Sequence, residues 1–264
     1  MQKIQIKEKL KSAIQIYKKT KDPRAAEVIE HLNNILSTSK SRDSLLDYAK
    51  HIYPGYKDPA HIKLIAKNLE ALEKNEINRL AVFMPPRHGK SMLCSEFFPA
   101  WYLGNNPNEF VIQSTYAQEL ADDFGRKVRN QIASPDFNSV FPQVGLRADS
   151  SSAKRFHTMQ GGTYSAVGAG GAITGRGAHL LIIDDPIKGR EDAESETQRK
   201  NLVEWYKSVA YTRLQPGGKI IIIQTRWHQD DLAGHILSES KEDWKILDLP
   251  AIDDKGNALW PEAY

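Results

Sequence analysis

The stretch Met84-Pro85-Pro86-Arg87-His88-Gly89-Lys90-Ser91 decides the fold. It follows the short apolar run 80–84, which is typical of a buried strand, and it precedes a segment that favours a helix. A glycine lets the backbone point its amides at phosphate oxygens, a lysine reaches terminal phosphates, and a serine hydroxyl reaches a magnesium ion. The usual pattern of such a loop begins with glycine, where this chain has Met84. The stretch therefore predicts a deviant phosphate loop; the alternative is an ordinary loop.

A second signal is an acidic pair at the end of another apolar run, 180–183. Asp184 and Asp185 follow this run directly, and a phosphate loop needs such a partner because magnesium must be held and a water must be oriented. We expect Asp184 to bind magnesium through water and Asp185 to position or activate the attacking water. The alternative is a strand that leads into a helix cap, since Pro186 and acidic residues are favourable there.

A third apolar run, 220–223, ends in Gln224 and Thr225. In a doubly wound sheet this run would neighbour the strand of the acidic pair, and its tip would face the nucleotide. Gln224 or Thr225 would then sense the terminal phosphate and couple hydrolysis to movement. The alternative is a plain polar strand end.

Apolar runs alternate with helical patterns from residue 60 onwards. The runs are 80–84, 110–112, 180–183 and 220–223, and the helical patterns are 61–72, a helix from 91, 117–132, 193–211 and 230–237, with a turn-rich middle. Such alternation is typical of a parallel sheet covered on both faces. We therefore expect an α/β fold of the P-loop NTPase type, with a mostly parallel central sheet flanked by helices and a helical N-terminal segment.

The turn-rich middle contains a glycine-rich segment, 161–177, with seven glycines. It is interpreted either as a mobile loop that admits a phosphate-rich polymer or as a plain hairpin connection.

The charge of the 264-residue chain is unevenly distributed, although its net value is only +3. Eight basic and two acidic side chains give residues 1–24 a charge of +6, and the rest of the chain carries −3. The basic segment has apolar residues at helical spacing, a second helix is expected over 24–36, and the serine-rich stretch 37–44 is expected to be a linker. The basic helix is either a solvated face or a docking surface for DNA or protein.

Composition excludes two classes of protein, namely membrane-spanning proteins and disulfide-rich proteins. No apolar run approaches the roughly 20 residues that span a bilayer, so no membrane partner is expected. The single cysteine, Cys94, permits no intramolecular disulfide, which favours a reducing compartment.

The motifs together resemble the large terminase subunit of tailed bacteriophages. The resemblance rests on residues 85–91, 173–177, 182–186, 225–228 and 230–232 and covers about residues 50–264. It implies an ATP hydrolase of the viral DNA-packaging motor, which uses ATP and Mg²⁺ to translocate double-stranded DNA into the procapsid in the cytoplasm of the bacterial host cell. The implied partners are double-stranded DNA, the portal protein, the small terminase subunit and further copies of the chain in a homo-oligomeric ring.

The resemblance also assigns roles to individual positions. The nucleotide-binding positions are Pro86, Arg87, His88, Gly89, Lys90, Ser91 and Met92, with Tyr56 and His61 as candidates for the adenine contact. Lys90 matches the phosphate contact, Ser91 and Asp184 match the magnesium ligands, and Thr225 matches the coupling motif.

The catalytic acid and the arginine finger are less closely matched. Asp185 occupies an acidic position that the family more often fills with Glu, and Glu191 and Glu194 are distant substitutes. Arg87 is the candidate finger in cis. The candidates in trans are Arg126, Arg129, Arg155 and Arg176.

We expect three parts: a helical basic arm over 1–45, a P-loop ATPase domain over 46–250, and the start of a linker over 251–264. Relatives continue into a nuclease domain, which we expect to be missing here, so no nuclease activity is expected. Two alternatives remain open, namely a helicase-like DNA translocase with the same core and a nucleotide-binding assembly module with little turnover.

Overall fold

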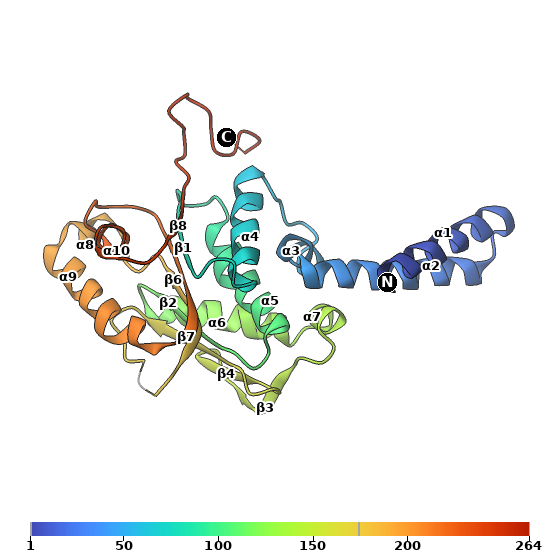
Figure 1. The fold of residues 1–264 in the computed structure, drawn as a ribbon, viewed down its shortest axis with the longest axis horizontal. Coiled ribbons are helices and arrows are strands. Elements are labelled where there is room, and N and C mark those ends of the chain that lie inside the picture. The colour runs from blue at the N-terminus through green and yellow to red at the C-terminus, as the bar shows by residue number, and fades with distance from the viewer. Residues whose placement is uncertain (1, 174, 264) are drawn as a thin grey trace.

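The computed structural model describes residues 2–173 and 175–263, and Figure 1 shows its fold. One eight-stranded sheet has the order β3-β4-β5-β2-β6-β7-β1-β8. The strands are β1 (Arg79–Phe83), β2 (Phe110–Thr115), β3 (Leu146–Ser151), β4 (Arg155–Thr158), β5 (Thr163–Gly168), β6 (Ala178–Asp184), β7 (Leu214–Gln224) and β8 (Lys245–Asp248). The α-helices are α1 (Gln2–Thr20), α2 (Pro23–Asp43), α3 (Leu45–Ile52), α4 (Ala60–Glu73), α5 (Phe98–Asn105), α6 (Gln118–Ile132), α7 (Pro135–Val140), α8 (Arg190–Glu194), α9 (Glu196–Trp205) and α10 (Leu232–Glu239). Two π-helical stretches are η1 (Met92–Phe97) and η2 (Tyr206–Ala210), and η3 (Tyr211–Arg213) is a 3₁₀ turn.

The sheet is mixed, so the expectation of a mostly parallel sheet does not hold. The pairs β1–β7, β1–β8, β2–β5, β2–β6 and β6–β7 are parallel, whereas β3–β4 and β4–β5 are antiparallel. The turns that join β3 to β4 and β4 to β5 are only a few residues long, which is too short for the crossover that parallel pairing requires. The antiparallel edge therefore lies in the turn-rich middle, where we expected no strand.

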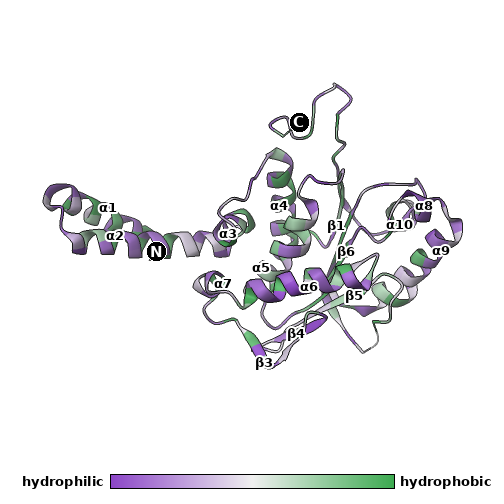
Figure 2. Ribbon diagram, turned by 180° about the vertical axis from the view of Figure 1, so that it is seen from behind, coloured by the Kyte–Doolittle hydropathy of each residue, from purple (hydrophilic) through white to green (hydrophobic). Residues whose placement is uncertain are grey.

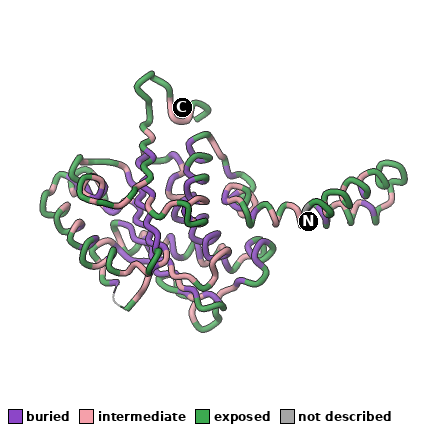
Figure 3. Tube along the Cα trace, viewed as in Figure 1, coloured by how far each residue is buried: buried purple, intermediate pink, exposed green. Residues whose placement is uncertain are grey.

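Helices cover the central strands on both faces (Figure 1). Leu180 and Ile182 of β6 belong to the core under α4, α5 and α6, whereas Leu181 and Ile183 belong to the core under α9 and α10. Because successive side chains of a strand point to opposite faces, one continuous apolar run serves both cores. Figure 2 shows the resulting hydrophobic strands, and Figure 3 shows that they are buried.

Several predicted elements are confirmed to within a few residues. The helical patterns 61–72 and 117–132 correspond to α4 and α6, and the runs 80–84 and 180–183 correspond to β1 and β6. The pattern 193–211 is instead divided into α8, α9, η2 and η3. The division falls at Ser195, whose side chain accepts a hydrogen bond from the Gln198 amide and so caps α9.

The serine-rich stretch 37–44 is not a linker, and that expectation is wrong. α2 continues through it to Asp43. Thr38 Oγ1 donates to the Asn34 carbonyl at 2.9 Å, which lets a polar side chain stay within a helix. Ser41 is buried, and its carbonyl accepts a hydrogen bond from Trp101 Nε1 at 3.0 Å. α2 is thereby anchored to the main body.

The glycine-rich segment is part strand. β5 occupies 163–168 and pairs with β2 on one side and β4 on the other, so this half is no mobile loop. At Gly168 an added Cβ would lie 2.9 Å from the Gln118 amide nitrogen, so the absence of a side chain lets α6 begin close to the strand. Thr174, which belongs to the segment used for the family resemblance, lies outside the described residues.

Candidate functional site

The loop 84–89 connects β1 to a helical segment that begins at Lys90. Arg87 has φ +64° and Gly89 has φ +87°. A Cβ at Gly89 would also lie 3.2 Å from Ile62 Cδ1 on α4, so both the backbone and the packing favour glycine there. The Arg87 side chain is exposed, whereas Lys90 is buried. The loop therefore directs Lys90 inward.

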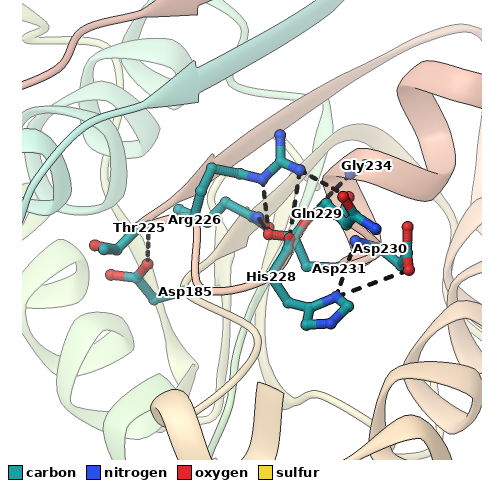
Figure 4. A network of polar contacts seen from close by, with 9 residues as sticks. Asp185, Thr225, Arg226, His228, Gln229, Asp230, Asp231 and Gly234 are labelled. Atoms are coloured by element: carbon teal, nitrogen blue, oxygen red, sulfur yellow. Dashed lines mark hydrogen bonds and ion pairs between the residues drawn. The ribbon is translucent and has the colours of Figure 1, made fainter. Parts of the chain in front are cut away.

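Lys90 meets the ends of two other strands. Its Nζ lies 3.1 Å from Asp185 Oδ2 and donates a hydrogen bond to Thr225 Oγ1 at 3.0 Å. The Thr225 amide in turn donates to Asp185 Oδ1 at 2.7 Å, a contact that Figure 4 shows. These residues follow β1, β6 and β7, which are neighbours in the sheet. The sequence-predicted lysine, acid and coupling threonine are thus brought together at the carboxyl ends of these three parallel strands.

Asp185 turns sharply at the end of β6. Its φ is +41°, a left-handed conformation that is uncommon for a residue with a side chain, although aspartate tolerates it better than most. The Asp185 amide donates to the Ile223 carbonyl at 2.8 Å, and its carbonyl accepts from the Tyr116 amide at 3.2 Å. These bonds hold the strained turn, and strain of this kind concentrates at functional sites.

Asp184 is buried beside the same cluster. Its Oδ2 accepts a hydrogen bond from Ser95 Oγ at 2.6 Å, and Oδ1 is buried without a partner among the described residues. Burial raises the pKa of Asp184 to about 6, and the negative charge of Asp185 adds to the rise. The nearby Ser91 and Ser95 side chains each act to lower this pKa. The charge of this carboxylate is therefore incompletely compensated.

A divalent cation fits the donors at this position. Asp184 Oδ1 and the Ser91 hydroxyl are oxygen donors of the kind that magnesium prefers. Across 2–173 and 175–263, no group of three or more His, Cys, Asp or Glu side chains could enclose a metal. A cation held here by few protein ligands would keep several waters, as magnesium commonly does.

Gln224 points away from Lys90. Its Nε2 donates to Asp231 Oδ2 at 2.8 Å, and Arg226 Nε donates to the same oxygen at 2.7 Å. Asp231 Oδ1 accepts from the Gly234 amide at 2.9 Å and caps α10. The residues around Asp231 form the network in Figure 4. Of the two coupling candidates, only Thr225 contacts Lys90.

Tyr56 belongs to the core near the loop. Its ring packs edge-on against Phe97, with the ring centroids 5.2 Å apart, and its hydroxyl is buried without a partner in the described part of the chain. Pro86 is exposed at the tip of the loop, and Met92 is half-buried as the first residue of η1. π-helical turns occur often at functional sites.

His61 links the loop to the C-terminal segment. Its Nε2 lies 3.1 Å from the His88 carbonyl oxygen, and its Nδ1 lies 3.3 Å from the Leu259 carbonyl oxygen. The ring centroid of Trp260 lies 5.6 Å from the ring centroid of His61 and 6.4 Å from that of His88. His61 is thus a contact between the loop and residues far along the chain.

A comparison with models of known protein families shows to which family the chain belongs. A family model described as the N-terminal part of the T4-like virus type of large terminase subunit matches residues 82–262. The chain belongs to this family. Membership indicates a role in phage DNA packaging, and the resemblance seen in the sequence is confirmed. No curated protein matches the chain.

The match contains most of the site of this terminase chain. It begins within β1 and includes the loop, the acidic pair and Thr225, whereas Tyr56 and His61 precede it. In the described segments of this terminase chain, no helix is both long enough and apolar enough to cross a membrane.

The four arginines proposed as fingers in trans lie at three places in the terminase chain, with Arg126 and Arg129 both on α6. Arg126, on α6, pairs with a carboxylate one turn earlier in its own helix, and Arg129 donates to the Ser151 carbonyl at 3.1 Å. Arg155 is exposed on β4. Arg176 precedes β6, and its pKa is lowered by burial first and by the charge of Arg155 second.

The structural roles of three residues of the site were not foreseen. Ser95 follows Ser91 by four positions, a spacing that places both on one side of a helix and was therefore detectable. Asp231 precedes an apolar helical pattern, as N-cap residues do. Trp260 carried no local signal, because its ring contacts are with His88 and His61, which are far away along the chain.

Proposed function

We propose that this chain is a magnesium-dependent ATP hydrolase with a P-loop NTPase fold that drives the viral DNA-packaging motor and translocates double-stranded DNA into the procapsid. The observation that carries the proposal is the convergence of Lys90, Asp185 and Thr225 at the carboxyl ends of β1, β6 and β7. In open α/β sheets, ligands bind in the crevice at the carboxyl ends of the strands. Family membership supports the packaging role.

The loop residues 86–92 would bind the phosphates. Backbone amides exposed by the positive φ angles at Arg87 and Gly89 would face the anion, and Lys90 Nζ would move from Asp185 to the terminal phosphate. Arg87 is exposed at the loop and would reach the phosphates in cis. Ser91 and Asp184 would hold magnesium, which when bound would neutralise charge on the phosphate oxygens.

Asp185 would orient the attacking water. Once Lys90 turns to the phosphate, Oδ2 of Asp185 is left free to accept a proton, while Oδ1 stays fixed by the Thr225 amide. Because Thr225 contacts both Lys90 and Asp185, its position would change with the state of the nucleotide. Gln224, tied to Asp231, would pass that change to α10.

We place the ATPase domain at 46–250, the basic arm at 1–45 and a linker at 251–264. The proposed partners are double-stranded DNA, the portal protein, the small terminase subunit and other copies of this chain in a ring. The proposed location is the host cell cytoplasm.

A second candidate function is a nucleotide-binding assembly module with little turnover. It is favoured by the Lys90–Asp185 contact, which occupies both groups with each other, and by Met84 in place of the first glycine.

Phosphate release from Mg-ATP tests the proposal. Lys90→Ala and Asp185→Asn should each lower the rate by about 100-fold or more, since phosphate neutralisation or water orientation is lost. Lys74→Ala, a charge change in the turn after α4, serves as the control and should leave the rate unchanged. Tight ATP binding without phosphate release by the wild type, even with DNA and partner subunits, would select the assembly module.

A further inference from the structure

We propose that the hairpin of α1 and α2, hereafter the basic hairpin (residues 2–43), is a binding surface for the phosphate backbone of double-stranded DNA. The inference rests on the proposed function in one respect only: it takes the bound DNA to be the duplex that the packaging motor translocates. It concerns a surface outside the Lys90 site, and the family match begins only at residue 82.

The positive charge of the basic hairpin is concentrated on α1, the turn after it and the first turn of α2. Seven basic side chains there are exposed: Lys7, Lys9, Lys11, Lys18, Lys19, Lys21 and Arg24. None of them forms an ion pair with another of the described residues. Lys21 Nζ lies only over the Tyr17 ring, 5.4 Å from its centroid. A solvated helix usually distributes acids among its lysines, whereas here the charge is left for an external anion.

Three of these lysines form a line. At about 100° per residue, Lys7, Lys11 and Lys18 lie within roughly 40° around the helix axis, and their Cα atoms span about 16 Å. Each strand of a duplex carries one phosphate charge per about 3.4 Å of the helix axis, so the line is long enough to match several phosphates of one backbone.

The basic hairpin is placed where a long polymer can reach it. Figure 1 shows α1 and α2 side by side, extending away from the sheet, and Figure 3 shows α1 largely exposed. α2 is fixed at its far end, because Arg42 donates to the Val140 carbonyl at 2.6 Å through one of its guanidinium nitrogens. The basic surface is therefore held in a defined direction by the main body.

A groove lies at the base of the basic hairpin. Its volume is about 800 Å³, and it is lined from three helices by Lys7, Lys40 and Lys50. Asp47 also lines it, and Lys50 pairs with Asp58 at 2.8 Å, so Lys7 and Lys40 supply the available charge. The line of lysines leads into this groove, and the two together provide a continuous basic path.

The distribution of apolar side chains favours DNA over an acidic protein. A protein interface normally has a buried apolar centre. On α1 the two most exposed isoleucines, Ile4 at 65% and Ile16 at 52%, lie about 120° apart around the axis and form no common stripe. A duplex needs no such stripe, because interfaces with DNA are polar and positively charged.

The affinity of the full chain for a fluorescein-labelled duplex of arbitrary sequence, measured by anisotropy between about 50 and about 200 mM salt, tests the inference. The test variant is Lys7→Gln/Lys11→Gln/Lys18→Gln, since glutamine preserves helix propensity. Its control, Lys241→Gln/Lys245→Gln/Lys255→Gln, removes the same charge from exposed positions after α10. Lys7→Arg/Lys11→Arg/Lys18→Arg keeps the charge, and circular dichroism checks the helix content of all variants.

We expect the test variant to lose at least about tenfold in affinity and the slope of log K against log salt to decrease by about 3, one for each phosphate contact. The control and the arginine variant should bind as the wild type does. Equal losses in the test and control variants, or no binding of the duplex by the wild type, would overturn the inference and leave the surface to an acidic protein. ATP hydrolysis is measured separately: a chain that binds DNA through these lysines without hydrolysing ATP refutes the proposed function and leaves this inference standing.

Discussion

Lys90 Nζ lies 3.1 Å from Asp185 Oδ2, and the two residues follow strands separated in the sheet only by β7. Lys90 is 5% exposed, so Asp185 compensates a nearly buried charge. In the absence of nucleotide, the contact between these two groups stabilises the fold. By the proposed function, the same two groups take part in hydrolysis when nucleotide is bound, and phosphate would compete with Asp185 for Lys90.

Asp185→Ala should therefore destabilise the protein. Removing the carboxylate leaves the Lys90 ammonium buried and unpaired, and because Asp185 itself is about a third exposed, we expect a loss of about 2 kcal/mol in the free energy of unfolding. Lys90→Met should cost less, since the remaining carboxylate reaches water. Urea denaturation of both variants measures the difference, and a larger loss in Lys90→Met would contradict this explanation.

The stability contribution of Asp184 should depend on pH in a predictable direction. Its folded pKa, raised to about 6 from 3.8, means that the folded protein binds this proton more tightly than the unfolded chain. The ionised carboxylate thus lowers stability above pH 6, and the penalty disappears as the pH falls through 6 to 3.8. Relative to Asp184→Asn, the metal-free wild type should gain as much as about 3 kcal/mol over this range.

Urea denaturation of the wild type and Asp184→Asn at several pH values, with a chelator present, measures that gap. Comparing the two proteins removes the effect of groups whose pKa is lowered, such as Asp58 and Glu242. A gap independent of pH would show that folding does not raise the pKa of Asp184. Magnesium should stabilise the wild type more than the variant above pH 6.

Gly89→Ala should impair the loop more than a comparable change elsewhere. The new Cβ would face both a positive φ of +87° and the Ile62 side chain at 3.2 Å. Gly217→Ala is the matched control, because Gly217 has φ +75° and nothing within 4 Å of an added Cβ. We expect a loss of about 1 kcal/mol in the control and about 2 kcal/mol or more in Gly89→Ala. Equal losses would mean that Ile62 yields freely.

His61→Ala should loosen the C-terminal segment from the loop. The change removes the contacts with the His88 and Leu259 carbonyls and the ring contact with Trp260. We expect faster hydrogen exchange in residues 251–263 and in the loop, measured by mass spectrometry. His31→Ala, at an exposed position on α2, is the control. Unchanged exchange in both segments would show that His61 does not hold them together.

Much of the fold could be predicted because β6 and β7 are continuous apolar runs and α4 and α6 have regular helical spacing. The antiparallel edge was missed because β3 is largely exposed and its residues 146–151 carry no apolar alternation. The serine-rich end of α2 was misjudged because its helix is stabilised by contacts with Trp101 and Val140, distant in sequence.

The site could likewise be predicted where local sequence signals determine it, and not where it depends on contacts distant in sequence. Asp184, Asp185 and Thr225 lie at the ends of β6 and β7, and Lys90 lies at the end of the loop that follows β1. Parallel strands bring such positions together. The direction of the Gln224 side chain could not be predicted, since it depends on the single oxygen of Asp231 that it shares with Arg226.

Phosphate release at saturating Mg-ATP, measured for the wild type and Asp185→Asn together with the ATP affinity of both, tests the central claim most directly. If Lys90, Asp185 and Thr225 form a hydrolytic site, Asp185→Asn should bind ATP at least as tightly as the wild type, because Lys90 loses a charged competitor. The variant should release phosphate more slowly by about 100-fold or more. A variant that releases phosphate as fast as the wild type, or a wild type that binds ATP and releases none, would contradict it.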